Sequence, residues 1–341
     1  MSKQELEITA KAMVASGKGI LAMDESTPTC KSRFEKLGIA CTEKNRQAYR
    51  DMLVTTDGLS EFVGAAILFD ETIRQKTLDG TPFATYLSNV GIMPGIKVDK
   101  GAKDLAGHPG EKVAEGLDGL RERLAEYKDL GARFTKWRAV ITIDQDIPSR
   151  ACIAANAHGL ARYAALAQET GLVPIVEPEV LINGNHTIER CYAVTEETLH
   201  AVFNELTAQS VHLEGMILKP SMVISGLDSA QRAGVTAVAE KTMRCLLHTV
   251  PAAVPGVAFL SGGQTDEEAS AHLNAMHNLG RELPWTLTFS YARALQQRAM
   301  ELWHGEAANV AAAQKALYHR ARLNSAAARG SYSEAMEKEA A

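Results

Sequence analysis

The chain has 341 residues, of which 46% are hydrophobic and 23% are charged, as is typical of a soluble globular protein with a large core. Its formal net charge is −5 and it contains no long run of Lys and Arg, so it lacks the positive patch that nucleic acids and anionic membranes attract. We therefore expect neither a nucleic acid nor a membrane among its partners.

Eight short apolar runs occur along the chain, and each is typical of a buried strand. In chain order they read KGILAMDES, FVGAAILFD, MPGIKVD, RFTKWRAVI, LVPIVEPEV, LEGMILKPS, GVAFLSGG and WTLTFSYAR.

Helical signals separate most of these runs. Apolar residues at three- and four-residue steps predict a helix from Val113 to Leu130. A second helix is predicted from Ser149 to Thr170, with Gly171 at its end, and Thr265 to Glu268 reads as a capping box that opens another. The Ala-rich region from Tyr291 to Arg329 is also expected to be helical.

This alternation predicts an α/β fold, a (β/α)8 TIM barrel that forms a single domain over residues 1–341 and ends in a helical extension. The alternative is an open doubly wound sheet with an extra lobe, but no GxGxxG motif follows the first run. Residues 330–341 lack a periodic apolar face, and we expect them to form a flexible tail.

Ionisable and polar side chains lie at the ends of six predicted strands, which together form the functional face of a barrel. They are Asp24, Ser26, Lys97, Lys136, Arg138, Glu177, Glu179, Lys219, Ser290 and Arg293. Where two of them are two residues apart, both lie on the same side of the strand and are expected to face the barrel axis. The structural alternative is a lattice of ion pairs that only closes the barrel mouth.

Lys219 ends an apolar run, and its position suggests a nucleophile. A lysine can form a Schiff base when burial or a nearby cation lowers its pKa, and Lys136 and Arg138 are expected two strands away. Lys97 and Lys136 are the alternative nucleophiles.

Glu177 and Glu179 are expected on the neighbouring strand, where a carboxyl group could supply the proton for loss of water during imine formation. Two crowded carboxylates do not both ionise easily, so we expect one of them to stay protonated near neutral pH.

Two regions are candidate phosphate sites. The loop after the seventh run contains Ser261, Gly262 and Gly263, whose backbone N–H groups could approach an anion, and Arg293 could add a bidentate contact. Lys97 and Ser26, on the other side of the mouth, could hold a second phosphate.

The remaining signals concern metals, redox state and location. The histidines form no metal-binding motif, and we expect neither a metal nor another cofactor. The five cysteines form no CxxC pair and are expected to be free thiols. The N-terminus shows no signal peptide and the chain no long apolar window, so we expect a cytoplasmic protein.

Seven ordered motifs closely resemble those of the class I fructose-bisphosphate aldolases, from about Lys11 to Tyr332. They are KGILAMDES, GIKVDKG, TKWRAV, IVEPEV, LKP, FLSGGQ and FSYARALQ. The resemblance implies a (β/α)8 barrel, usually a homotetramer. Such an enzyme reversibly cleaves fructose 1,6-bisphosphate to dihydroxyacetone phosphate and glyceraldehyde 3-phosphate without a metal, in glycolysis, gluconeogenesis or carbon fixation.

The resemblance also implies a role for each matching residue. Lys219 would form the Schiff base and Glu177 would serve as acid and base in the imine chemistry. Lys136 and Asp24 would take part in the carbon–carbon step, with Glu179 supporting the charge network. The substrate's phosphates and hydroxyls would be bound by Ser26, Arg33, Lys97, Arg138, Ser261, Gly262, Gly263, Ser290 and Arg293.

The sequence departs from the family pattern at three positions and at its end. Pro28 replaces a glycine, Ser32 stands where the first of two basic residues is common, and Ala292 replaces a glycine beside Arg293. The chain ends in KEAA, whereas animal members end on a tyrosine that visits the site.

Two other functions are compatible with the same residues. One is another Schiff-base aldolase of sugar phosphates, including one acting on sedoheptulose 1,7-bisphosphate. The other is a sugar-phosphate binding or scaffold protein without turnover.

Overall fold

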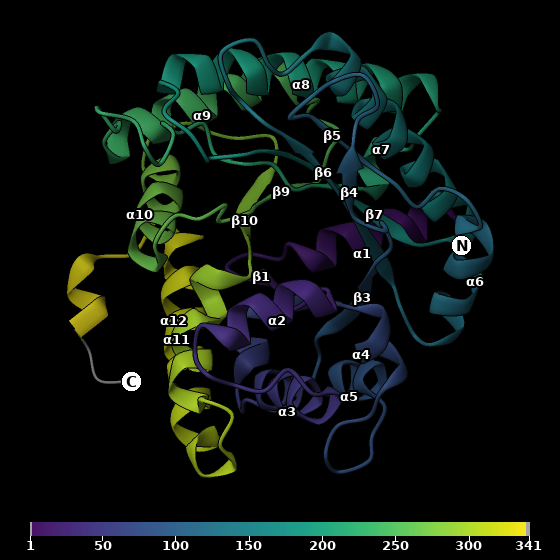
Figure 1. The fold of residues 1–341 in the computed structure, drawn as a ribbon, viewed down its shortest axis with the longest axis vertical. Coiled ribbons are helices and arrows are strands. Elements are labelled where there is room, and N and C mark those ends of the chain that lie inside the picture. The colour runs from purple at the N-terminus through teal and green to yellow at the C-terminus, as the bar shows by residue number, and fades with distance from the viewer. Residues whose placement is uncertain (1, 339–341) are drawn as a thin grey trace.

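Eight parallel strands form a closed barrel in the computed structural model, which describes residues 2–338 (Figure 1). Around the barrel the strands follow the order β1-β10-β9-β8-β7-β6-β3-β2. They are β1 (Gly19–Ala22), β2 (Val63–Leu68), β3 (Met93–Lys97), β6 (Phe134–Ile141), β7 (Val173–Val180), β8 (Ile217–Leu218), β9 (Gly256–Phe259) and β10 (Thr286–Tyr291). Each lies within one of the eight apolar runs, so the predicted (β/α)8 barrel is confirmed.

Helices surround the barrel, and a large apolar core fills the space between the two layers. The helices are α1 (Lys3–Met13), α2 (Thr27–Glu35), α3 (Glu43–Val54), α4 (Asp70–Arg74), α5 (Phe83–Asn89), α6 (Leu120–Asp129), α7 (Arg150–Thr170), α8 (Ile188–Ala208), α9 (Val235–Thr249), α10 (Asp266–His277), α11 (Arg293–Trp303) and α12 (Val310–Ala327). Aromatic rings fix parts of this core. Trp137 of β6 stacks on Tyr163 of α7, with ring centroids 5.5 Å apart.

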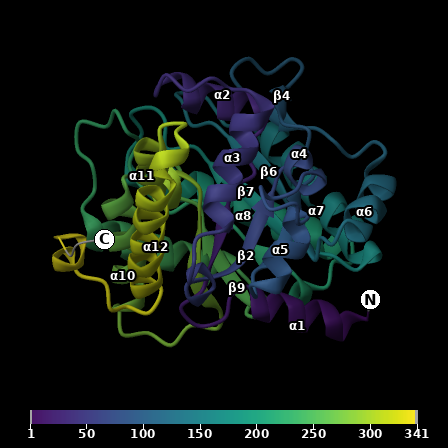
Figure 2. The same cartoon turned by 90° about the horizontal axis from the view of Figure 1, so that it is seen from below.

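A second, smaller core fills the inside of the barrel. It contains strand residues such as Ile20, Phe134 and Ile175, and it is closed at one end by Leu6 and Met13 of α1. Figure 2 shows α1 at this end of the molecule, and α2 with β4 (Ala102–Asp104) at the opposite end. Because all eight strands are parallel, their carboxyl ends meet at that second end, the barrel mouth.

Two predicted helices have different bounds in the structure. The helix expected from Val113 begins only at Leu120, because residues 112–114 form β5 (Lys112–Ala114), which pairs antiparallel with β4. Gly119 then adopts a left-handed conformation with φ of 64° immediately before α6. The helical region after Tyr291 is divided into α11 and α12, since residues 304 and 305 both have positive φ.

Other local predictions are confirmed. Ser149 caps α7, and Gly171 ends it in the left-handed conformation. Thr265 and Glu268 form the predicted capping box of α10. All five cysteines are free.

The C-terminal segment contacts the barrel's helices as far as it is described. The guanidinium of Arg320 on α12 donates to both carboxylate oxygens of Glu337, at 2.8 and 2.9 Å, and the Tyr332 hydroxyl donates to one of them at 2.7 Å. Residues 339–341 of the expected tail lie outside the described residues, and the flexibility of the tail stays a prediction. Within residues 2–338, no helix is long and apolar enough to cross a membrane.

The variant Gly95→Ala tests the packing inside the barrel. A Cβ on Gly95 of β3 would lie 2.3 Å from ring atoms of Phe134 in the close-packed interior. We expect Gly95→Ala to lower the free energy of unfolding by about 1–3 kcal/mol, measured by urea denaturation. The control is Gly159→Ala in α7, where an added Cβ would meet no atom within 4 Å apart from the adjoining backbone of its own helix, and this change should stabilise the protein by up to about 1 kcal/mol. If Gly95→Ala and Gly159→Ala have the same free energy of unfolding, Phe134 does not pack closely against Gly95.

Candidate active site

The side chains inside the barrel change from apolar to charged near the mouth. On β6, Phe134 belongs to the inner core, and Lys136 follows two residues later on the same face of the strand. The same step leads from Ile175 to Glu177 on β7, and from Ile217 to Lys219 at the end of β8. Alternation along each strand therefore delivers the charged groups to one place.

Four of these groups form a continuous chain of ion pairs across the mouth. Lys136 Nζ lies 2.7 Å from Asp24 Oδ2 and 3.1 Å from Glu177 Oε2. Glu177 Oε1 lies 3.1 Å from Lys219 Nζ. The side chains of Lys136, Glu177 and Lys219 are each no more than 4% exposed, so every one of these charges is buried beside its opposite.

The ion pairs around Glu177 disfavour a proton on its carboxyl group, and the expectation that one of Glu177 and Glu179 remains protonated stays a prediction. Burial alone would raise the pKa of Glu177, but the ammonium groups of Lys136 and Lys219 lower it below its usual value. The same balance lowers the pKa of Asp24, where Lys136 and Lys219 outweigh burial. Crowding does not force a proton onto Glu177, because Glu179 pairs with a cation of its own, Arg138.

Lys136 shows the opposite balance. Burial alone would lower its pKa, but the carboxylates of Asp24 and Glu177 raise it well above the usual value for a lysine. Lys136 is therefore a firmly charged ammonium group between two carboxylates, which makes it a poor nucleophile.

Lys97 and Arg33 are also paired in the structure. Lys97 Nζ lies 2.6 Å from Asp99 Oδ1, and the guanidinium of Arg33 pairs with the carboxylate of Glu25. Sequence reasoning found both cations but missed both carboxylates. Asp99 lies two residues after Lys97 and Glu25 follows Asp24, so their closeness to expected site residues was the available signal.

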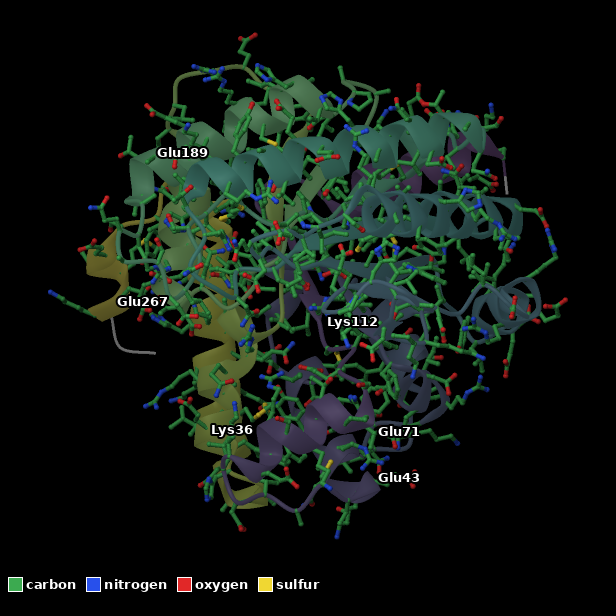
Figure 3. All side chains as sticks on the ribbon, turned by 45° about the horizontal axis from the view of Figure 1, so that its top comes forward. Lys36, Glu43, Glu71, Lys112, Glu189 and Glu267 are labelled. Atoms are coloured by element: carbon green, nitrogen blue, oxygen red, sulfur yellow. The ribbon has the colours of Figure 1, made fainter. Side chains whose placement is uncertain are left out.

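Helix side chains hold the main chain on both sides of Asp24. Arg50 of α3 is fully buried and donates to the carbonyl oxygen of Glu25 at 2.7 Å, and Gln296 of α11 donates to the carbonyl two residues before Asp24 at 2.6 Å. A guanidinium nitrogen of Arg50 also lies 3.1 Å from a carboxylate oxygen of Glu71. Glu71 is labelled in Figure 3. Sequence reasoning missed this support, because a buried arginine on an amphipathic helix reads as a surface residue.

The glycine loop and Arg293 lie together on the other side of the mouth. Gly262 and Gly263 have positive φ, 60° and 108°, which few other residues adopt. A Cβ on Gly263 would lie 3.5 Å from a terminal nitrogen of Arg293. Ser290, at the end of β10, is buried, and its hydroxyl has no hydrogen-bond partner among the described residues. The glycine loop, a guanidinium and an unpaired hydroxyl therefore lie around one region, which suits an anion.

One cavity of about 1230 Å³ joins these groups. Every expected site residue lines it except Gly263, which lies beside Arg293. Among the described residues, ten Lys and Arg side chains but only six Asp and Glu side chains line the cavity. It is therefore positive in a chain whose net charge is −5, as expected for a site that binds an anion.

Within residues 2–338, no three His, Cys, Asp or Glu side chains are grouped so that they could hold a metal ion. Independence of a metal stays a prediction.

The chain matches known proteins over nearly its whole length. Residues 5–341 match the family model described as fructose-bisphosphate aldolase class-I. A probable fructose-bisphosphate aldolase class 1 of Xanthomonas campestris is 62% identical, over 97% of this chain and 99% of that protein. A fructose-bisphosphate aldolase of Dictyostelium discoideum is 52% identical, over 96% and 92%.

A solved structure agrees with the fold. The fructose-bisphosphate aldolase of Plasmodium falciparum, crystallised with TRAP and a small-molecule inhibitor, superposes with a TM-score of 0.95 at 49% identity. The match covers 97% of this chain and 96% of that one.

The variant Lys136→Met tests the charge balance of the ion-pair chain. It leaves Asp24 and Glu177 without their shared cation, and we expect the free energy of unfolding at neutral pH to fall by about 3–5 kcal/mol. In the wild type both carboxylates have lowered pKa values, so the stability they contribute is present above pH about 4 and is lost as the pH falls through the lowered pKa values. The difference between variant and wild type should therefore shrink in urea denaturation below pH about 4.

The control for this experiment is Lys112→Met, which removes the cation of an exposed pair with Asp104 and should change stability little. A loss in Lys136→Met that is the same at every pH would show that packing, and not charge, is responsible.

Proposed function

The chain belongs to the class I fructose-bisphosphate aldolases, a family of carbon–carbon lyases, and from this premise we propose that it cleaves fructose 1,6-bisphosphate reversibly through a Schiff base on Lys219, without a metal. The products would be dihydroxyacetone phosphate and glyceraldehyde 3-phosphate. The observation that carries the proposal is the buried ion-pair chain in which Glu177 bridges Lys219 and Lys136.

Lys219 and Glu177 are positioned for imine formation. At 3.1 Å, the Glu177 carboxylate can take a proton from the Lys219 ammonium, which leaves a neutral amine to attack the ketone carbon. The carbinolamine that forms then loses its hydroxyl as water when Glu177 returns a proton to that oxygen. The result is a protonated imine with Glu177 again a carboxylate.

Asp24 and Lys136 are positioned for the carbon–carbon step. A carboxylate that takes the proton of the C4 hydroxyl allows the C3–C4 bond to break, and the bonding electrons pass into the protonated imine to give a neutral enamine. We assign this base to Asp24, with the fixed charge of Lys136 at 2.7 Å stabilising the charges that develop. Arg138 and Glu179 support the same network through their ion pair.

The strand order suggests where the two phosphates bind. Lys219 follows β8, and the neighbouring β9 leads into the loop with Ser261 and Gly262, so the phosphate next to the reacting ketone is expected there with Ser290 and Arg293. The distal phosphate is expected across the barrel, near Ser26, Arg33 and Lys97. These residues follow or lie on β1 and β3, which flank β2.

We further propose a single-domain enzyme that works in the cytoplasm as a homo-oligomer, a tetramer by family resemblance. Two relatives in Arabidopsis thaliana, each 50% identical over 96% of this chain, are named cytosolic, which supports the location for this chain. The reaction would serve glycolysis, gluconeogenesis or carbon fixation.

Reduction by borohydride tests the nucleophile directly. With dihydroxyacetone phosphate present, borohydride should reduce the imine to a stable secondary amine, and peptide mass mapping should place the adduct on Lys219. Lys219→Arg should give no adduct and should lose at least about a hundredfold in kcat for fructose 1,6-bisphosphate, since a guanidinium is not deprotonated. An adduct on Lys97 or Lys136, or loss of wild-type activity on adding a chelator, would contradict the proposal.

The variant Gly263→Ala tests the phosphate loop. Its φ of 108° is unfavourable for alanine, and the added methyl would lie beside Arg293. We expect KM to rise about tenfold or more for both fructose 1,6-bisphosphate and fructose 1-phosphate, since both carry the phosphate beside the ketone. The control Gly107→Ala also has a positive φ, 78°, but no neighbour within 4 Å, and KM should stay at the wild-type value. If Gly263→Ala and Gly107→Ala have the same KM, the loop does not take part in substrate binding.

A further inference from the structure

The ammonium group of Lys97 is held at two points by a single residue. Its Nζ donates to the carboxylate Oδ1 of Asp99 at 2.6 Å and to the main-chain carbonyl oxygen of Asp99 at 2.9 Å. An ammonium group has three N–H donors, so one remains for another partner. Lys97 lines the active-site cavity and its side chain is 14% exposed, which leaves this third donor within reach of a bound molecule.

The Asp99 carboxylate is itself fixed by the main chain on two sides. Oδ1 also accepts from the N–H of Gly101 at 3.0 Å, and Oδ2 accepts from the N–H of Arg138 on β6 at 3.1 Å. The carboxylate therefore joins the end of β3 to the neighbouring strand β6, next to the paired residues Lys97 and Lys136. With the side chain only 2% exposed, Asp99 has no freedom to turn toward the cavity.

We propose that Asp99 is a positioning residue that holds the Lys97 ammonium in place for the distal phosphate of the substrate. The proposal rests on the proposed function, in which Lys97 binds that phosphate. A free lysine loses the rotamer freedom of its four-carbon chain when it binds an anion. Here that freedom is already lost in the unbound protein, so binding does not have to supply the cost again.

The opposite effect, competition between Asp99 and the phosphate for Lys97, is disfavoured by the same geometry. The side chain of Asp99 is 2% exposed and that of Lys97 is 14% exposed, so the ammonium is the more accessible of the two groups to an incoming phosphate. Its negative charge is shared among three donors, the Lys97 ammonium and two backbone N–H groups. Lys97 can therefore use its third donor for the phosphate without leaving Asp99.

The test measures the binding of two analogues that cannot be cleaved, because they lack the ketone. One is a hexitol 1,6-bisphosphate and the other a hexitol 1-phosphate, and calorimetry gives Kd for both. Asp99→Asn removes the charge that holds Lys97 and should weaken bisphosphate binding about five- to tenfold, with a much smaller effect on the monophosphate. In a Lys97→Met background, the same Asp99 change should alter bisphosphate Kd less than about twofold, since the group it positions is absent.

Asp104→Asn is the matched control. Asp104 is a nearby carboxylate on β4 that pairs with the exposed Lys112 and does not line the cavity, so neither Kd should change. If Asp99→Asn fails to fold, Asp99→Glu replaces it. This variant keeps the charge but moves it along the longer side chain, and it too should weaken bisphosphate binding only when Lys97 is present.

Three results would overturn the proposal. Tighter bisphosphate binding in Asp99→Asn would show that Asp99 competes with the phosphate. Equal losses for both analogues, or equal losses with and without Lys97, would show a general structural role. Cleavage of fructose 1,6-bisphosphate by the wild type is measured separately, as kcat and KM. If the wild type binds as expected but does not cleave, the proposed function fails while the role of Asp99 stands.

Discussion

The barrel mouth depends on the compensation of buried charges across strands. A carboxylate or an ammonium group that leaves water loses several kcal/mol of hydration, and only an opposite charge in good geometry recovers it. Asp24, Lys136, Glu177 and Lys219 alternate in sign along one chain, and each lies within 3.1 Å of its neighbour. No member of this chain can change its charge without affecting the others, so the residue at the end of one strand constrains the residues at the ends of three more.

Because the buried charges depend on one another, several contacts around the mouth fix the main chain that carries them. Arg50 and Gln296 bind main-chain carbonyls on both sides of Asp24, and Glu71 in turn binds Arg50. Asp99 ties the end of β3 to the backbone of β6. Ion pairs need accurate distances to recover their hydration, and these contacts fix the main chain from which the charged side chains project.

Features that depend on neighbouring residues in the sequence were predictable, and features that depend on contacts between distant segments were not. The strands were predictable because apolar runs and two-residue alternation are local, and alternation alone placed Lys136 and Glu177 on the inner face of the barrel. The start of α6 was not, because the pairing of Lys112–Ala114 with β4 overrides a helical pattern. The lowered pKa of Glu177 was not predictable, since it depends on which cations lie within about 3 Å, and that is set by tertiary structure alone. The partners of Lys97 and Arg33 were missed for the same reason.

The position of α1 at one end of the barrel bears on the route by which substrate enters and products leave. Leu6 and Met13 of α1 belong to the apolar core that fills the barrel at the end opposite the mouth, so among the described residues apolar side chains occupy the barrel axis at that end. In the proposed cleavage, the aldehyde fragment and the fragment attached to Lys219 would both leave through the barrel mouth. In that scheme the aldehyde is not covalently attached and would depart first, while the other fragment would stay until its bond to Lys219 is hydrolysed. A single opening thus serves both products, and the proposed covalent bond to Lys219 sets the order in which they leave it.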